Sequence, residues 1–389
     1  MARLRLRDEA LLLGLAGLVT GASCAGPRGG SEYRFLADAD TNEERFLTGA
    51  TRKEADRKAD DPAGRLEWPG PPDEPRVRYL GEFRSSEDVG ARTGNWFERV
   101  LFGEESGHAL VTPQSVAVGS GWAAVADPNV GVHRFSPRGD YELLRSFVEA
   151  GPSGQREGSA GGSGGASAPV AVTAVGGETL WVSDAAAGCV FVLQGQGRAR
   201  ELGRGVLKRP GGLAYCPVSG VVRVADAGGH EVVLFDLEGR LVGRVGRRGA
   251  GAGEFNYPSH VATAADGRWA VADSLNFRVQ VFDADDRFIM QVGGKGNAAG
   301  NLALPKGVAF DADGNLWVVD AQFENVQAFD REGRLLMAFG QEGHGPGEFW
   351  LPSGMCIDEK NRMWVADTYN RRVQVFLILR EGSGADGDD

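Results

Sequence analysis

The 389-residue sequence contains few residues that commonly bind metals or haem. It has 5 histidines and 4 cysteines, and no His-x-x-x-His, His-Glu-x-x-His or Cys-x-x-Cys-His spacing occurs. These absences exclude a local zinc motif and an attached c-type haem. Cys189, Cys216 and Cys356 stand among apolar neighbours, which predicts buried thiols. Their odd number excludes complete internal pairing, and Cys189 with Cys216 is the one plausible disulfide.

Positive charge is also in short supply. The formal net charge is −11 and the sequence pI is about 5.1, which disfavours a nucleic-acid-binding protein. Basic residues occur in expected turns, namely Arg247, Arg248, Lys295, Arg371 and Arg372. We interpret them as solvated loop residues and predict no nucleic-acid partner.

Long hydrophobic runs are missing. The run from Ala10 to Val19 is too short to span a bilayer as a helix, but it has the length of a signal-peptide core. It follows three arginines and ends at "TGASC", which resembles a bacterial lipobox with Cys24 as the acylated residue. The alternative is an ordinary cleaved signal with an incidental cysteine. We predict an exported protein, lipid-anchored through Cys24 at the outer membrane and facing the periplasm or the exterior.

Two flanking segments lack the apolar content of a folded domain. Residues 25–75 are charged and rich in Gly and Pro, which predicts a flexible tether after the signal peptide 1–24. Residues 380–389 form an acidic tail that we expect to be disordered. The folded domain is therefore predicted to span 76–379, with a flexible surface insertion at 151–169.

What the chain has in abundance is glycine (59 residues) without a collagen-like period, together with an internal repeat. Six copies each open with a proline, reach an aspartate 14 to 16 residues later, and place a large apolar residue beyond it. The prolines are Pro113, Pro169, Pro210, Pro258, Pro305 and Pro352. The aspartates are Asp127, Asp184, Asp226, Asp273, Asp320 and Asp367. A period near 47 residues indicates a propeller or a solenoid.

Each copy reads as four short strands. "GVAFD", "LWVVD", "NVQAFD" and "RLLMAFG" (307–340) are separated by Asp-x-x-Gly turns and show no helical periodicity. Such a unit is one antiparallel propeller blade. We therefore predict an all-β, six-bladed β-propeller of four-stranded antiparallel blades that start near 113, 169, 210, 258, 305 and 352.

The repeat "GNLWVVD…NVQAFD" and its copies resemble the NHL repeat family, most closely from Pro210 to Phe376. The resemblance implies a propeller fold but specifies function poorly, because NHL propellers serve as enzymes, RNA binders and scaffolds. The lead-in "WPGPPDEPRVRYLGEF" is similar to that of bacterial envelope proteins of this family.

The sixth copy stops after its third strand, "RRVQVFLIL", and would leave an unpaired edge. The segment "RVRYLGEF" (76–83) has the pattern of a fourth strand and no blade of its own. We predict that it pairs with Val373–Leu379 and closes the ring.

Few residues are candidates for chemistry. The six aspartates are too dispersed around a ring to share one cation, and we expect them to bind backbone N–H groups. The second residue after each proline lies on the innermost strand and is small in five copies. The exception, His260, is predicted to project into the central channel, and Ser115 is the other polar residue at this position. We predict no catalytic residues and no resident metal ligands.

Two functions remain open at this point. The first is a non-catalytic, monomeric envelope scaffold that binds an unknown protein partner, with no cofactor. The alternative is a zinc- or calcium-dependent enzyme with a site at the central channel, like the peptide-amidating lyase or gluconolactonase-like propellers that the fold resembles. Such a site needs three or more converging ligands.

Overall fold

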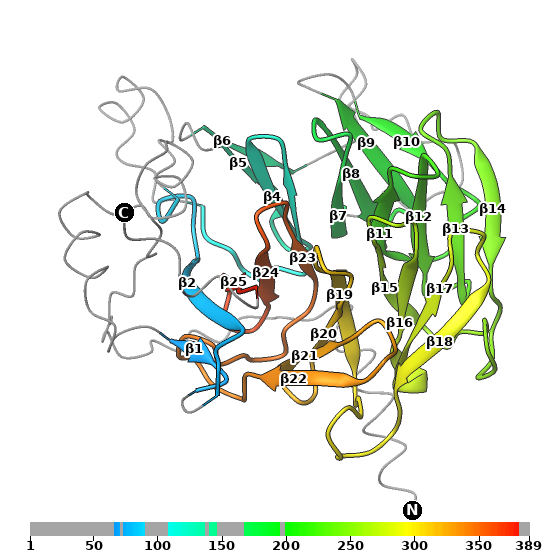
Figure 1. The fold of residues 1–389 in the computed structure, drawn as a ribbon. Coiled ribbons are helices and arrows are strands. Elements are labelled where there is room, and N and C mark those ends of the chain that lie inside the picture. The colour runs from blue at the N-terminus through cyan, green and yellow to red at the C-terminus, as the bar shows by residue number, and fades with distance from the viewer. Residues whose placement is uncertain are drawn as a thin grey trace, which may run out of the picture. The chain divides into compact units, whose positions relative to one another are not determined.

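The computed structural model describes residues 66–70, 73–89, 108–136, 140–145, 167–194 and 199–380. Within them, six antiparallel sheets form the blades of a propeller, and strand follows strand with almost no helix (Figure 1). The predicted all-β, six-bladed architecture is confirmed. The signal segment, Cys24, most of the tether and the acidic tail lie outside the described residues.

The strands are as follows, from the innermost strand outward in blades 1 to 5. Blade 1 contains β3 (Ser115–Gly119), β4 (Trp122–Asp127), β5 (Gly131–Phe135) and β6 (Tyr141–Leu144). Blade 2 contains β7 (Pro169–Val175), β8 (Thr179–Asp184), β9 (Cys189–Gln194) and β10 (Arg200–Leu202). Blade 3 contains β11 (Pro210–Cys216), β12 (Val221–Asp226), β13 (Glu231–Phe235) and β14 (Leu241–Val245). Blade 4 contains β15 (Pro258–Thr263), β16 (Trp269–Asp273), β17 (Arg278–Phe282) and β18 (Phe288–Gly293), with a 3-10 turn η2 (Ser274–Asn276) after β16. Blade 5 contains β19 (Pro305–Phe310), β20 (Leu316–Asp320), β21 (Asn325–Phe329) and β22 (Leu335–Phe339).

Blade 6 is assembled from both ends of the folded part of the chain. Its inner strands are β23 (Met355–Ile357), β24 (Arg362–Asp367) and β25 (Arg372–Ile378), and β2 (Val77–Phe83) follows β25 in the sheet (Figure 1). The register runs from Val77 opposite Ile378 to Phe83 opposite Val373. The predicted ring closure by residues 76–83 is confirmed.

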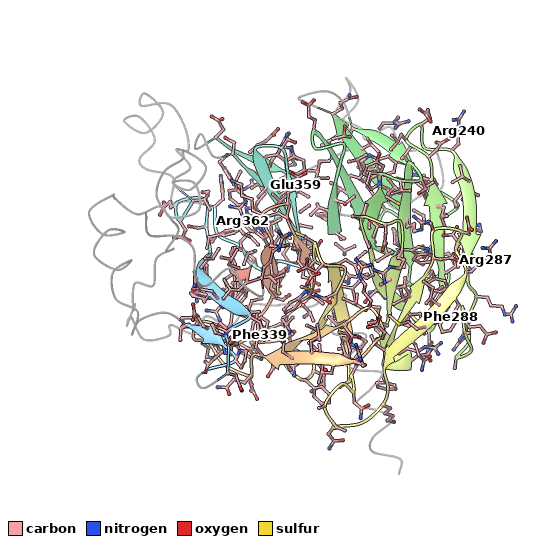
Figure 2. All side chains as sticks on the ribbon, in the orientation of Figure 1. Arg240, Arg287, Phe288, Phe339, Glu359 and Arg362 are labelled. Carbon is pink, nitrogen blue, oxygen red and sulfur yellow. The ribbon has the colours of Figure 1, made fainter. Side chains whose placement is uncertain are left out.

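A fifth strand extends blade 6 beyond the prediction. β1 (Glu67–Trp68) pairs antiparallel with β2, so the segment assigned to the tether is part of the sheet at residues 67–68. The centroid of the Trp68 ring lies 5.3 Å from that of Phe339 and 6.0 Å from that of Phe376. Figure 2 shows Phe339 next to β1. The tether boundary at 75 was therefore too late, because a two-residue strand among prolines has no alternating pattern to detect.

The turns between the outer strands form for local reasons. In blade 5 the Asp330 carboxylate accepts N–H bonds from Glu332 and Arg334 at 3.0 and 2.8 Å. Gly333 has φ +81°, a conformation that L-residues rarely adopt. The Asp-x-x-Gly pattern therefore determines the hairpin between β21 and β22.

The apolar core lies between neighbouring blades. Trp181, Trp317 and Trp364, each three residues before a repeated aspartate, are all buried in these layers. At the seam, Phe83 from β2 packs edge-on against Phe135 of blade 1 and against Trp364 of blade 6. The closing strand therefore contributes to the core of two blades.

The outer strands of blades 3 to 5 leave apolar side chains in solvent. Phe288 and Ile289 of β18 are exposed, as are Leu241 and Val242 of β14 and Leu336 of β22. Figure 2 shows Arg287 and Phe288 at this outer margin. Blade 6 differs because β1 covers the edge of β2.

Candidate functional site

The candidate site lies at one end of the ring. The inner strand begins and the second strand ends there, since Pro210, Pro258 and Pro305 pair with Asp226, Asp273 and Asp320. The blade-to-blade links 246–258, 293–305 and 340–352 reach the same end. We call this end the link face.

The six repeated aspartates hold the link face together. Each is fully buried, and each accepts backbone N–H bonds from residues that precede the inner strand. Asp226, for example, binds the N–H groups of Lys208 and Arg209 at 2.9 and 2.7 Å. Asp320 also accepts N–H bonds from Gln322 and Phe323 in the following turn, at 2.9 and 3.0 Å. The predicted structural role of the aspartates is confirmed. They bind N–H groups just before the inner strand as well as in the turn that follows them.

The inner strands join across blade boundaries at the axis. The Gly307 N–H donates to the Ser353 carbonyl at 3.0 Å, and the Gly354 N–H donates to the Gln114 carbonyl at 2.8 Å. A Cβ at either glycine would lie 2.6 Å from that same carbonyl oxygen. The small residues that the sequence shows at this position are therefore required by the close approach of backbones.

His260 lies where the inner-strand pattern predicted. Gly212 and Gly354 have no Cβ atom. A Cβ built on Gly212 would lie 2.9 Å from the His260 Cδ2, and one built on Gly354 would lie 3.1 Å from the His260 Nε2. The imidazole of blade 4 therefore contacts blade 3 and reaches blade 6. Both ring nitrogens are buried and have no hydrogen-bond partner among the described residues.

Ser115 and His260 meet at Gly354. The Cα of Ser115 lies 2.9 Å from the same Cβ position that His260 Nε2 approaches. Ser115 is buried, and its Oγ accepts the N–H of Val172 at 3.4 Å, which links blade 1 to blade 2. The structure thus brings the two predicted channel residues together; a ligand at them stays a prediction.

Lys306 affects the charge state of the channel residues, and the sequence analysis did not identify it. Burial lowers the pKa of His260 to about 3, and the Lys306 ammonium adds to that shift. Burial also lowers the pKa of Lys306 itself to about 8, with a further contribution from Arg209. His260 is therefore neutral at neutral pH, able to donate one hydrogen bond and accept another. Comparing the residues that directly follow the six prolines would have revealed Lys306 as the one cation.

Aromatic side chains are exposed on the link face at blade 6. Trp350 in the link and Tyr369 in the turn after β24 are 40% and 46% exposed, with ring centroids 5.5 Å apart. The His344 ring meets Trp350 edge-on at 5.2 Å. We call His344, Trp350 and Tyr369 the blade 6 aromatic cluster.

A second aromatic contact lies between blades 3 and 4. The rings of His230 and Tyr257 are 4.7 Å apart, and the His230 Nδ1 accepts the Tyr257 N–H at 3.2 Å. Burial lowers the pKa of His230, helped by Arg248 and Lys208. Tyr257 is 36% exposed, so aromatic surface occurs in two sectors of the link face.

The basic turn residues divide into two groups. Arg247 is exposed and pairs with Glu254 at 2.8 Å, and Arg371 is exposed. Arg372 is 1% exposed and pairs with Asp367 at 2.7 Å, so its interpretation as a solvated residue was wrong. Its position at the start of β25 places it beneath the link rather than on the turn.

Several other expectations concern ligands and anchoring. Cys189, Cys216 and Cys356 are free thiols, so the one plausible disulfide is not formed in the structure. Across the described ranges, no group of three or more His, Cys, Asp or Glu side chains is positioned to hold a metal ion. In the same ranges, no helix is long and apolar enough to cross a bilayer. Lipidation at Cys24 stays a prediction, because that residue lies outside the described part of the chain.

Comparison with known proteins supports the repeat and the fold. Residues 349–376 match the model of the NHL repeat, which confirms the prediction for the last blade. No curated protein matches this sequence.

Among solved structures, an auxiliary nutrient binding protein from Bacteroides thetaiotaomicron is similar at 10% identity and a TM-score of 0.53, covering 69% of each chain. Virginiamycin B lyase from Staphylococcus aureus is similar at 14% identity and a TM-score of 0.50, covering 69% of this chain and 96% of the lyase. A Bacteroides thetaiotaomicron protein of unknown function reaches 0.53 at 12% identity, covering 76% of this chain and 75% of its own. These likenesses establish a shared fold.

Proposed function

We propose that this chain, a six-bladed β-propeller that carries an NHL repeat in its last blade, is a non-catalytic scaffold that binds a protein partner through its link face. The observation that carries the proposal is the blade 6 aromatic cluster. Trp and Tyr dominate the energetics of protein interfaces, because they bury much area at a low cost in side-chain entropy. Two such side chains, each at least 40% exposed and in mutual contact, form a suitable anchor.

The rest of the link face suits such a role. The turns and links that present the cluster are held by buried aspartates; Asp367, for example, accepts the Trp350 N–H at 2.9 Å. A preorganised surface loses little conformational entropy on binding. The sequence features of the N-terminus place this scaffold, as part of the proposal, in the cell envelope as a lipoprotein anchored through Cys24.

The proposal is tested by chemical crosslinking in the membrane fraction of expressing cells, with the full chain compared with Trp350→Ser/Tyr369→Ser. We expect a partner that crosslinks to the wild-type chain and is lost from the double variant. Leu241→Ser/Val242→Ser on β14 is the matched control, because it removes a similar apolar area from the outer edge. A partner that is lost equally from both variants, or retained by both, contradicts the use of this face.

The zinc- or calcium-dependent enzyme stays the alternative. The observation that favours it is His260, whose two enclosed ring nitrogens have no partner among the described residues. Metal analysis of the purified chain separates the two functions. Stoichiometric zinc or calcium that is lost in His260→Ala would replace the scaffold with a metal site in the channel.

A further inference from the structure

An arginine at the start of the third strand fills a slot beneath the link in blade 4. Arg278 pairs across the ladder with Asp273 and donates to its carboxylate at 2.9 Å. The same guanidinium donates to the carbonyls of Gly251 and Glu254 in the link at 2.8 and 3.0 Å, and to Gln291 Oε1 on β18 at 2.8 Å.

Blade 6 repeats this arrangement. Arg372 donates to Asp367 at 2.7 Å and to the link carbonyls of Gly345 and Glu348, both at 2.8 Å. Its remaining contact with the outer strand is Glu82 on β2, at 2.5 Å. Arg372 also donates to the His344 carbonyl at 2.9 Å. In both blades the guanidinium therefore meets a carboxylate, at least two link carbonyls and an outer-strand acceptor.

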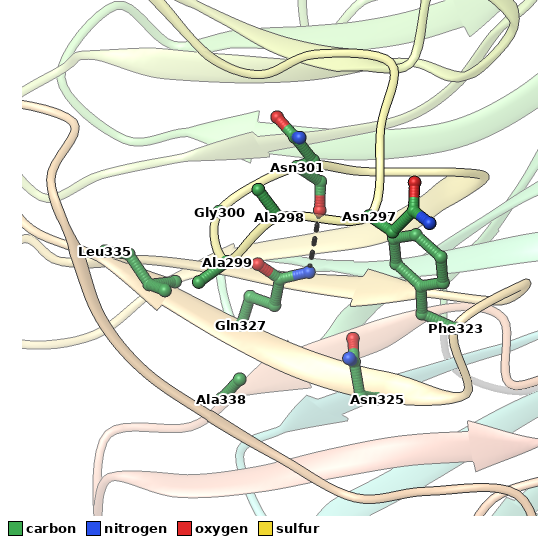
Figure 3. Close-up of a pocket in the computed structure, with 10 residues that line it drawn as sticks. All are labelled: Asn297, Ala298, Ala299, Gly300, Asn301, Phe323, Asn325, Gln327, Leu335 and Ala338. Atoms are coloured by element: carbon green, nitrogen blue, oxygen red, sulfur yellow. Dashed lines mark hydrogen bonds between the residues drawn. The ribbon is translucent and has the colours of Figure 1, made fainter.

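Blade 5 lacks both the arginine and its outer-strand partner. Asn325 stands opposite Asp320, where blades 4 and 6 have arginine. Ala338 stands opposite Gln327, where blade 4 has Gln291 opposite Gln280. A pocket of about 290 Å³ occupies the slot, between the link residues 297–301 and strands β21 and β22 (Figure 3).

Two buried side-chain oxygens of the slot have no hydrogen-bond donor among the described residues. Gln327, 3% exposed, donates from Nε2 to the Asn301 carbonyl at 3.0 Å (Figure 3), but its buried Oε1 has no partner. The buried Oδ1 of Asn325 likewise has no partner in the described part of the chain. In blade 4 the corresponding glutamine oxygen, of Gln280, accepts the Gly253 N–H at 2.9 Å. Buried oxygens left without donors raise the free energy of the folded state.

The carboxylate of the slot is held by backbone N–H groups and, in the described part of the chain, not by a cation. Asp320 is fully buried and accepts N–H bonds, and the described residues contain no ion pair to it. Asp273 and Asp367 each have an arginine. The Ala298 carbonyl, which corresponds to that of Gly251, accepts the Asn301 N–H at 2.9 Å and retains a second lone pair.

We propose that the blade 5 pocket binds a guanidinium group supplied from outside the chain, in the position that Arg278 and Arg372 occupy in their own blades. The planar donor fork of a guanidinium matches several acceptors at once, whereas an ammonium is a compact and strongly hydrated charge. The group can belong to a free guanidinium compound such as arginine or to an arginine side chain of a partner. The inference goes beyond the proposed scaffold function and does not depend on the blade 6 aromatic cluster.

The test is thermal unfolding and calorimetric titration of the full chain with low millimolar guanidinium chloride, L-argininamide and the peptide Gly-Arg-Gly. We expect each of these to bind and to raise Tm, since a ligand of the native state stabilises it. Sodium chloride and L-lysinamide at equal ionic strength should not. Tighter binding of the peptide than of argininamide identifies a partner's side chain as the source, and equal or weaker binding identifies a free compound.

Two variants fill the slot from different sides. Asn325→Arg should restore the arrangement of blade 4, raise Tm in the absence of ligand and abolish binding. Ala338→Leu should block the pocket from an exposed position of β22 and abolish binding even if the arginine variant fails to fold. Arg278→Ala opens the equivalent slot in blade 4 and should gain a second guanidinium-dependent rise in Tm. Equal responses to guanidinium and sodium, or guanidinium binding that persists after Ala338→Leu, would overturn the proposal.

Discussion

Blades 5 and 6 are copies of one repeat that differ in how completely they are connected. Blade 5 is continuous in sequence, but a pocket lies beneath its link where blades 4 and 6 have an arginine side chain, and the oxygens of Asn325 and Gln327 have no donors among the described residues. Blade 6 joins two distant parts of the chain, and its Arg372 makes ion pairs with Asp367 and with Glu82 on β2. Blade 4 is continuous as well and has the same contact through Arg278, so the arginine is not needed to form a blade, whereas in blade 6 it also joins the two distant parts of the chain.

The largest effect should come from removing the closing strands. We expect a chain that lacks residues 66–83 to lose cooperative unfolding, because β25 would become an open edge and the core around Phe83 would be incomplete. Urea unfolding followed by tryptophan fluorescence measures this. Deletion of the outer strand of blade 5, β22, is the comparison, and an unchanged transition midpoint in the first variant would show that the ring does not need its closure.

The next effect separates the two slots directly. Arg372→Ala should lower the free energy of unfolding by about 3–5 kcal/mol, because it leaves Asp367 as a buried charge without its ion-pair partner. Burial already raises the pKa of Asp367, and Arg372 opposes that shift. Asn325→Ala in blade 5 should cost about 1 kcal/mol or less, since Asn325 Oδ1 has no donor to lose.

Denaturant titration of both variants checks the difference. Equal losses in the two blades would mean that the arginine slot is no more important at the closure than elsewhere.

The sequence predicted the contacts that repeat and missed those that depend on a single copy. The proline and aspartate spacing gave six blades, and the pattern of 76–83 gave the closing strand with its partner. The burial of Arg372 was missed because its acceptors come from a link more than twenty residues away. A column-by-column comparison of Arg278, Asn325 and Arg372 would have indicated that blade 5 lacks the arginine, but not the volume of the pocket that results.

The sequence predicted where His260 lies in the fold, but not its contacts or its protonation. The small residues after each proline identified His260 as the exception, and it does lie on the inner strand. That its ring reaches Gly354 of blade 6 depends on how closely the blades approach at the axis, which no single repeat encodes. Lys306 affects the titration of His260 from the neighbouring blade for the same reason.

A smaller effect is a pH dependence that comes from two histidines, His260 on the inner strand of blade 4 and His133 on β5, the third strand of blade 1. Burial holds the pKa of His260 at about 3 and that of His133 at about 4, below the ordinary value of 6.5. Below pH 6.5 the unfolded chain therefore binds more protons than the folded chain. The stabilisation by these two groups is complete above pH 6.5 and is lost as the pH falls toward 3 to 4, by at most about 1.4 kcal/mol per pH unit for each group.

Denaturant titrations between pH 7 and pH 4 measure this slope. His260→Gln should reduce the slope and leave the part due to His133. An identical slope in the variant would place the origin of the pH dependence elsewhere.

The smallest expected effect concerns β1, the one strand that blade 6 has and blade 5 lacks. Trp68→Ala should lower the free energy of unfolding by about 1–2 kcal/mol, because the half-buried ring covers Phe339 and Phe376 from outside the closed sheet. Thermal unfolding measures the loss, and light scattering at high protein concentration measures the exposed edge. If β1 protects the edge of β2, the variant should self-associate more than wild type, whereas Leu336→Ala on the already exposed edge of blade 5 should not. If the variant loses stability without self-associating, β1 contributes only to packing and does not protect the edge. The two blades would then differ in their core contacts and not in how their edges are protected.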